Sequence, residues 1–139
     1  MSDIEKIFEF LDKAGIFYLC TVKDNRPKSR PFNFKMLDNG QIYFGTSTFK
    51  EVYKQIVENP YVEIVSTDDP KFIRYYGKVV FDDDEELVEK AFEKMPFMRQ
   101  IYNEETGLKL RMFHLEDATC EFRNKSSIKP DEVINLYDT

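Results

Sequence analysis

The residues best suited to chemistry lie where an expected strand meets an expected helix. Thr46, Ser47 and Thr48 end the strand, and Lys50 and Lys54 follow in the helix. A helix N-terminus presents unpaired N–H groups and about half a positive charge. Phosphate binds at such places, and the three hydroxyl groups would add further donors. The residue types and their spacing therefore predict an anion site at this turn.

The two lysines give a second indication. Thr48 and Glu51 have the spacing of a capping box, so the helix is expected to begin at Phe49. Lys50 then falls in the first helical turn, where the helix dipole disfavours a cation and a bound dianion would reverse that effect. Lys54 lies one turn further along the same face. Ordinary solvated lysines at an exposed helix start are the alternative, and spacing does not decide which lysine would hold the phosphate.

Arg30 is the next candidate. It shares an expected strand face with Phe32 and Phe34, so its guanidinium lies either at the rim of the sheet or near a ligand. Pro31 removes a ladder donor and marks an edge or irregular position. Free backbone groups beside Pro31 could hydrogen-bond a heterocycle.

Other chemical motifs are weak or missing from the sequence. His114 is the single histidine and stands in an apolar context, which favours a structural role over that of a base or a haem ligand. Cys20 and Cys120 are a hundred residues apart, so neither a zinc site nor a disulfide is predicted, and Cys20 is expected to be a buried free thiol. The sequence has no phosphate-loop, dinucleotide-binding or serine-hydrolase motif.

Periodicity gives the elements that must position these residues. Asp38–Asn39–Gly40 is a strong hairpin signal, and Gly77 predicts a bulge or a close backbone approach within its strand. Helices are expected from the Ser2 capping box to Ala14, over Phe49–Glu58, from Asp82–Glu85 to Met95, as one turn at Phe97–Tyr102, and at Pro130–Tyr137 in the polar tail. The expected strands are Ile16–Lys23, Lys28–Met36, Gln41–Thr46, Tyr61–Thr67, Phe72–Phe81 and Leu108–Arg123.

Length and charge limit the number of domains and the kinds of ligand that the protein can be expected to have. A chain of 139 residues without repeats or a linker is expected to form one domain, 1–139, and its net charge of −6 argues against general nucleic-acid binding. No apolar stretch is long enough to cross a membrane and no signal segment is seen, so a cytoplasmic location is expected. Tight turns between strands predict an α+β protein with a six-stranded antiparallel β-barrel and flanking helices.

The order of these elements resembles a known family. The segments that carry the resemblance are Arg30–Pro31–Phe32, the Asp38–Asn39–Gly40 hairpin, Tyr43–Phe44–Gly45–Thr46–Ser47–Thr48, the helix that ends at Asn59–Pro60, and Ile73–Arg74–Tyr75–Tyr76–Gly77–Lys78. Together they resemble the pyridoxamine 5′-phosphate oxidase-like family of FMN-binding split barrels. The resemblance is strongest to short bacterial members related to general stress proteins and nitroimidazole-resistance proteins, and it covers about residues 5–122.

The resemblance implies a cofactor and a dimer. In such a six-stranded split β-barrel, two FMN molecules lie at the interface of a homodimer. Partner residues near Arg74 and Gly77 would complete each pocket. By position, Arg30 would approach the phosphate or ribityl chain, and Pro31, Phe32 and Asn33 would follow the isoalloxazine edge. The phosphate would be held by Thr46, Ser47, Thr48 and Lys50, with Lys54 as an auxiliary.

The C-terminal tail limits what the resemblance implies about the reaction. The oxidase uses a basic C-terminal segment to hold pyridoxal phosphate, whereas residues 124–139 offer only Lys125 and Lys129. The sequence therefore predicts an FMN-dependent oxidoreductase whose small-molecule substrate is unknown. A non-catalytic module that binds flavin, haem or another phosphate-bearing ligand is the alternative. An empty barrel that serves as a dimeric scaffold is a third reading.

Overall fold

Two tight turns join strands that are consecutive in the sequence into antiparallel hairpins. Asp24 and Asn25 have φ of 50° and 62°, and Asn39 and Gly40 have φ of 48° and 76°. Positive φ at both central residues is typical of the turns that close two-residue hairpins, and these residue types tolerate it. The expected hairpin at Asp38–Asn39–Gly40 is therefore confirmed.

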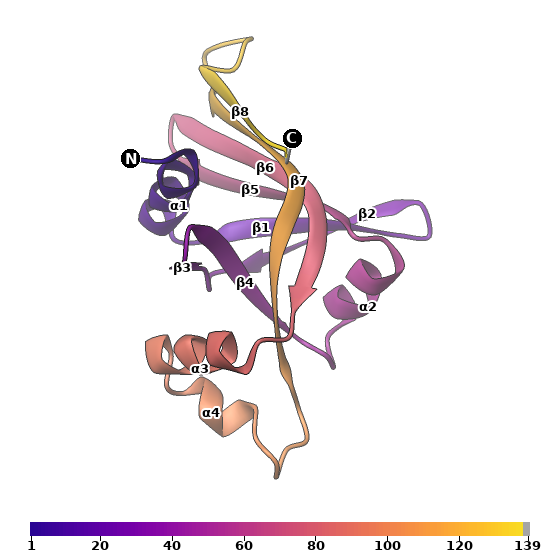
Figure 1. The fold of residues 1–139 in the computed structure, drawn as a ribbon. Helices are drawn as coiled ribbons and strands as arrows, with labels where there is room; N and C mark the ends of the chain where they lie inside the picture. The colour runs from indigo at the N-terminus through magenta and orange to yellow at the C-terminus, as the bar shows by residue number, and fades with distance from the viewer. Residues whose placement is uncertain (138–139) are drawn as a thin grey trace.

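A computed structural model of the chain describes residues 1–137 (Figure 1). Its helices are α1 Asp3–Ala14, α2 Glu51–Glu58, α3 Glu85–Lys94 and α4 Met98–Ile101. Its strands are β1 Phe17–Lys23, β2 Arg26–Phe32, β3 Met36–Asp38, β4 Gln41–Ser47, β5 Tyr61–Asp68, β6 Lys71–Asp82, β7 Leu110–Asn124 and β8 Glu132–Leu136.

All paired strands are antiparallel, and the long strand β7 organises the sheet. The strand order is β2-β1-β5-β6-β7-β4-β3, and β8 also pairs with β7. One edge of β7 pairs with β6; its other edge pairs first with β4 and then with β8. Among the described residues, β2 and β3 end the strand path, so the sheet curls into an antiparallel split β-barrel without closing (Figure 1). The expected α+β class is confirmed.

Three details of the expected fold are wrong. The sheet has eight strands and not six, because the expected strand Lys28–Met36 is interrupted after Phe32 and because β8 adds a strand. The helix expected at Pro130–Tyr137 is this strand β8, in which Ile134 alone is buried and which pairs with the free edge of β7. A short isolated helix is only marginally stable because its first turn is costly to form, whereas the free edge of β7 offers a ready hydrogen-bonding partner to an extended segment.

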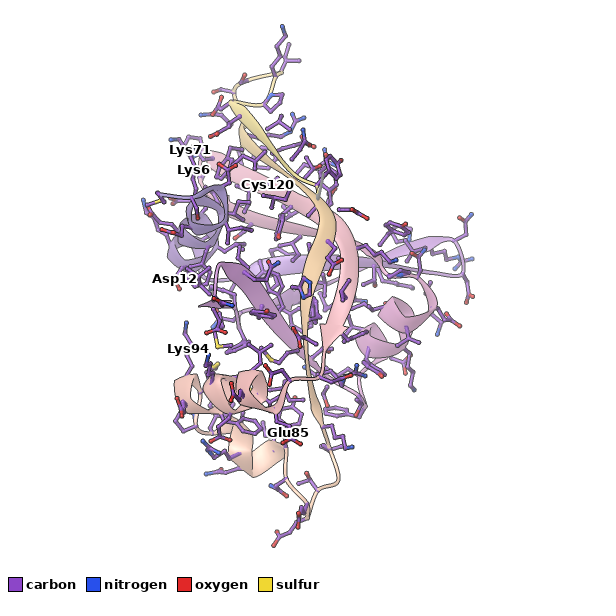
Figure 2. The ribbon with its side chains drawn as sticks, viewed as in Figure 1. Lys6, Asp12, Lys71, Glu85, Lys94 and Cys120 are labelled. Atoms are coloured by element: carbon purple, nitrogen blue, oxygen red, sulfur yellow. The ribbon has the colours of Figure 1, made fainter. Side chains whose placement is uncertain are left out.

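Helices cover the open parts of the barrel and divide the core in two. Helix α1 inserts Ile7 and Leu11 into a first core that includes Phe17, Phe44 and Phe113. Helix α3 packs on the second core, whose buried members are Met36, Leu87, Ala91, Met98, Leu110 and Met112. Figure 2 shows Lys94 of α3 near α1, where its Nζ lies 5.6 Å from the Phe8 ring centroid. No helix among residues 1–137 is long and apolar enough to cross a membrane.

Gly77 marks the point where two backbones come closest. The register of β6 with β7 shifts between Tyr76 and Lys78, which confirms the predicted bulge. A Cβ at Gly77 would lie 2.8 Å from the carbonyl oxygen of Glu116 and 2.9 Å from the Cα of Ala118. Because backbone atoms cannot move aside as a side-chain end can, only glycine fits here.

We predict that Gly77→Ala lowers the free energy of unfolding by about 1–3 kcal/mol, the range typical of overpacked sites. Denaturant-induced unfolding measures this change. Gly45→Ala in β4 is the matched control, since its Cβ would meet side-chain atoms of Leu110 and Met112, at 3.1 and 3.4 Å. Equal losses in the two variants would contradict the backbone explanation.

Candidate functional site

Arg30 is held on the inner side of the barrel and not in solvent at its rim. It pairs with the buried Leu19 across β1 and β2. Its guanidinium donates to the carbonyl oxygen of Leu19 (3.2 Å), to Oγ1 of Thr21 (2.7 Å) and to Oε1 of Gln55 on α2 (2.7 Å). These bonds use three of the five N–H donors of an arginine and leave two for a ligand. Burial lowers the pKa of this guanidinium, and the Cys20 thiol opposes the shift.

Lys50 lies over the strand to which Arg30 belongs. Its Nζ is 5.6 Å from the centroid of the Phe32 ring, and Phe32 is two residues from Arg30 on the same face of β2. An ammonium over an aromatic face is attracted by the ring quadrupole, which holds this cation near the strand. The structure therefore brings Lys50 to Phe32 of β2, while Arg30 of the same strand bonds to Gln55 of α2.

The start of α2 differs from the expected one. The helix begins at Glu51, and its N-cap is Lys50, which makes no side-chain capping bond. The predicted capping box of Thr48 and Glu51 is therefore wrong, as is the placement of Lys50 inside the first turn. A turn closed by the Lys50 N–H donating to the Ser47 carbonyl oxygen (3.1 Å) uses residues 48–49 and delays the helix. The first N–H groups of α2 thus have no side-chain cap.

Thr46 and Ser47 end β4 with two buried hydroxyl groups. Their exposed fractions are 2% and 0%, and neither hydroxyl oxygen has a hydrogen-bond partner among the described residues. Consecutive strand residues point to opposite sides of a sheet. Thr46 shares its side with Phe44 in the first core, whereas Ser47 pairs with Leu110 of the second core. The two orphaned hydroxyls therefore face different sides of β4, and Thr46 is the one on the Arg30 side.

Thr48 connects this turn to β7. Its N–H donates to the carbonyl oxygen of Lys109 (3.3 Å), and its side chain lines a hollow together with Arg111. The Arg111 guanidinium donates to the hydroxyl of Tyr53 on α2 (3.0 Å) and lies 4.5 Å from the Phe81 ring centroid. Its Nε is 2.9 Å from Oδ1 of Asp83, in an orientation that makes no hydrogen bond. Arg111 thus ties β7 to the first turns of α2.

Lys54 is engaged elsewhere on α2. Its Nζ is 3.3 Å from Oε1 of Glu51, and Lys23 lies 3.9 Å from the other oxygen of the same carboxylate. Its side chain is 64% exposed and borders a separate hollow of about 330 Å³ that also includes Gln55. The structure therefore groups Lys50, and not Lys54, with Phe32.

Pro31 and Asn33 are both exposed at the edge of the sheet. Within residues 1–137, strand β2 pairs only with β1, so its other edge carries free backbone groups as predicted for an edge strand with a proline. Asn33 follows the last residue of β2, where the chain leaves the ladder.

Three other reactive side chains lie away from this group. Nε2 of His114 is 2.8 Å from Oε2 of Glu116, its ring stacks edge-on with Tyr43, and its buried Nδ1 has no partner. Cys20 is half-buried and not buried as expected, because it faces the outer side of β1 beside Ser29 (3.4 Å). Lys35 is buried and donates to the carbonyl oxygen of Gly15 (2.7 Å), so it stabilises the end of α1.

Sequence reasoning missed four residues that hold the site in place: Thr21, Tyr53, Gln55 and Arg111. A usable signal existed for two of them. Thr21 occupies an inward position after Phe17 and Leu19, and Gln55 stands between the buried Val52 and Ile56 of α2. A polar side chain in a buried stripe must find a partner, which would have marked both positions.

Comparisons with known proteins give the family and the fold of the chain. The pyridoxamine 5′-phosphate oxidase family model matches residues 4–123. A NimC/NimA family protein from Clostridium acetobutylicum has a similar structure, with a TM-score of 0.84 and 28% identity, over 98% of this chain and 95% of that one. No curated protein sequence matches the chain.

Two further solved structures share the fold at lower identity. General Stress Protein 26 from Bacillus anthracis has a TM-score of 0.71 and 19% identity, over 98% of this chain and 100% of that one. A pyridoxamine 5′-phosphate oxidase-related, FMN-binding protein from Nostoc punctiforme has a TM-score of 0.67 and 17% identity, over 97% and 98%. Since the family model spans most of the sequence and the split barrel is present, the chain belongs to the pyridoxamine 5′-phosphate oxidase family.

Proposed function

We propose that this chain is an FMN-binding flavoprotein and that the β4–α2 turn holds the FMN phosphate. One observation carries the proposal: two cations lie where β2 and α2 meet, since Arg30 of β2 bonds to Gln55 of α2 and Lys50 at the uncapped N-terminus of α2 lies over Phe32 of β2. Two cations and free N–H groups form a site for a dianion.

The unpaired groups of the turn fit a phosphate ester. The hydroxyl of Thr46 is buried without a partner on the Arg30 side of β4, and Arg30 keeps two free donors. A buried hydroxyl without a partner costs free energy, which a ligand oxygen would recover. The proposed cofactor-binding residues are Arg30, Pro31, Phe32, Asn33, Thr46, Ser47, Thr48 and Lys50, with Lys54 as an auxiliary.

The phosphate assignment is tested by Lys50→Gln with Lys54→Gln as its matched control. We expect Lys50→Gln to weaken FMN binding about tenfold or more, the loss typical of one charge-assisted hydrogen bond, and to leave riboflavin binding unchanged. Lys54→Gln should change FMN binding less, because Glu51 already engages Lys54. Flavin fluorescence titration of the flavin-free protein measures both affinities, and FAD serves as a third ligand.

Two results would count against the assignment. Equal losses of FMN and riboflavin affinity in Lys50→Gln would show that the lysine contacts no phosphate. A larger loss in Lys54→Gln would move the phosphate to the hollow beside Lys23 and Gln55.

We further propose that the protein is an oxidoreductase acting on a small molecule. Bound FMN would supply hydride transfer, so the chain needs no side-chain nucleophile. The residues of the chain would bind and orient the cofactor. Arg30 and Lys50 would hold the phosphate, and the free backbone groups at Pro31 of β2 and at the following Asn33 would face the isoalloxazine ring. Two points support the proposal: the chain belongs to the pyridoxamine 5′-phosphate oxidase family, and its residues could bind a cofactor that itself supplies the redox chemistry.

Anaerobic addition of NADH or NADPH to the FMN-loaded protein tests the oxidoreductase proposal. We expect the visible absorbance of the bound flavin to fall at a rate that saturates with donor concentration. Free FMN at the same concentration is the control. If neither donor nor any other physiological reductant bleaches the band faster than in this control, a flavin carrier is the better description.

The outer face of the sheet supports the proposed homodimer. One cross-strand row on this face runs through Pro31, Tyr18, Val65, Arg74, Glu121 and Val133. Tyr18 and Val133 are 47% and 48% exposed, and Glu121 is bound by Tyr76 and Arg123 at 2.6 Å each. Arg74 makes an ion pair with Glu63 at 2.9 Å. Because the row ends at Pro31, a second copy on this face would lie beside the cofactor site.

Val65→Lys places a charge at the centre of this row and should convert the dimer to a monomer, as measured by sedimentation equilibrium. Val57→Lys is the control, because Val57 is 59% exposed on α2 and lies outside the row. We also expect Val65→Lys to weaken FMN binding, since each site would lose its partner. A wild-type protein that sediments as a monomer with FMN bound would refute the interface.

A further inference from the structure

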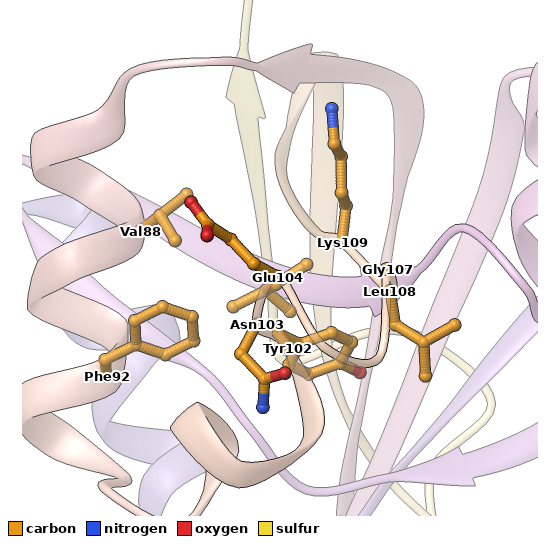
Figure 3. A pocket seen from close by; sticks show the side chains of 9 residues that line it. Val88, Phe92, Tyr102, Asn103, Glu104, Gly107, Leu108 and Lys109 are labelled. Atoms are coloured by element: carbon orange, nitrogen blue, oxygen red, sulfur yellow. The ribbon is translucent and has the colours of Figure 1, made fainter.

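A second hollow, separate from the Arg30 group, lies between α3 and the beginning of β7. Its volume is about 370 Å³. Its wall is mostly apolar and consists of Val88, Phe92, Tyr102, Leu108 and Leu110, with Gly107 in the loop that follows α4 (Figure 3). Cavities of roughly 300–1,000 Å³ lined by apolar and aromatic side chains are typical of small-molecule sites.

The hollow continues toward the proposed phosphate turn. An adjoining space of about 660 Å³ shares Val88, Lys109 and Leu110 with it and reaches Thr48 and Arg111. A molecule in the hollow would therefore lie on the side of β7 that borders this turn.

The rings of the wall remain only partly covered by the protein. Leu110 is buried in the second core, but Val88, Phe92 and Tyr102 pack against that core with part of their surface exposed. A ligand of matching shape would remove this apolar surface from water, which is favourable. Two aromatic walls favour a planar, aromatic one, because rings pack well edge-to-face or offset.

The polar groups at the mouth differ in their availability. Asn103 is used internally, since it accepts from the Thr106 N–H (3.0 Å) and donates to the carbonyl oxygens of Arg99 and Gln100. The side chains of Glu104 and Lys109 make no hydrogen bond or ion pair within residues 1–137, and in Figure 3 the Lys109 ammonium points away from the rings. The Glu104 carboxylate is thus the acceptor free to bind a ligand.

We propose that this hollow binds a small, planar, aromatic molecule that carries an N–H or O–H donor for Glu104. The proposal rests on the shape and lining of the hollow and does not depend on flavin binding. A bicyclic heterocycle has the size, the flat faces and the donor that the wall and the mouth require.

The test uses 5-fluoroindole as the probe and the full chain saturated with FMN. Fluorine NMR relaxation of the probe reports binding without interference from flavin absorbance. We expect saturable binding to one site per chain. Val88→Phe, which places a ring in the hollow, should weaken it at least about tenfold, and Glu104→Gln should weaken it less. Phe97→Ala is the control, because Phe97, the N-cap of α4, is 54% exposed and outside the hollow.

Four results would overturn the proposal. Binding that does not saturate, or that Phe97→Ala removes and Val88→Phe does not, would show attachment to surface apolar groups. Loss of binding on adding FMN to flavin-free protein would place the probe at the flavin site. If Val88→Phe does not fold, Val88→Ala replaces it: a widened hollow should bind 5-fluoroindole more weakly, and unchanged affinity would refute the site.

Discussion

The hydrogen bonds of the Arg30 guanidinium join three elements of the molecule, β1, β2 and α2. Its acceptors come from β1 and α2, while Arg30 itself belongs to β2. Oε1 of Gln55 accepts from both Arg30 and Thr21, at 2.7 and 2.5 Å, so the three side chains hold one another in a fixed arrangement. A buried charge is tolerated only when such partners replace water. The position of α2, and therefore of Lys50 at its N-cap, depends on this cluster.

Strand β7 provides the second constraint on the position of the β4–α2 turn, because it contacts both β4 and α2. Thr46 pairs with Arg111 and Ser47 pairs with Leu110, so the end of β4 is fixed against the beginning of β7. Arg111 then reaches Tyr53 on α2. The turn between β4 and α2 is thus held at both ends: pairing with β7 fixes its β4 end, and the bonds of Gln55 to Arg30 and of Tyr53 to Arg111 fix its α2 end. A turn held in this way is preorganised and would lose little conformational entropy on binding an anion.

Local rules predicted the parts of the fold that depend on neighbouring residues. Hairpin residues such as Asn39 and Gly40, the helix stop at Asn59–Pro60 and the bulge at Gly77 follow from backbone preferences that act within a few positions. The errors involve distant partners. Glu132–Leu136 forms a strand because the edge of β7 beside it is available for pairing. Arg30 points inward because it bonds to Gln55, which lies on a helix 25 residues later in the sequence. Sequence periodicity contains neither fact. The candidate residues themselves were identified from the sequence, whereas the separation of Lys54 from Lys50 required the structure.

The turn at the end of β4 contains the features that a protein selected for stability alone would not retain. The hydroxyls of Thr46 and Ser47 are buried without partners, the first N–H groups of α2 have no side-chain cap, and a lysine occupies the N-cap position. Each feature is unfavourable in the chain by itself. A bound dianion would offset most of this cost, because it would accept from the Thr46 hydroxyl and the N–H groups and pair with the lysine, whereas the Ser47 hydroxyl faces the other side of β4. A ligand that binds only the folded chain also raises its stability by mass action. Several unfavourable features that the same bound anion would relieve are therefore stronger evidence for an anion site than any of these residues considered separately.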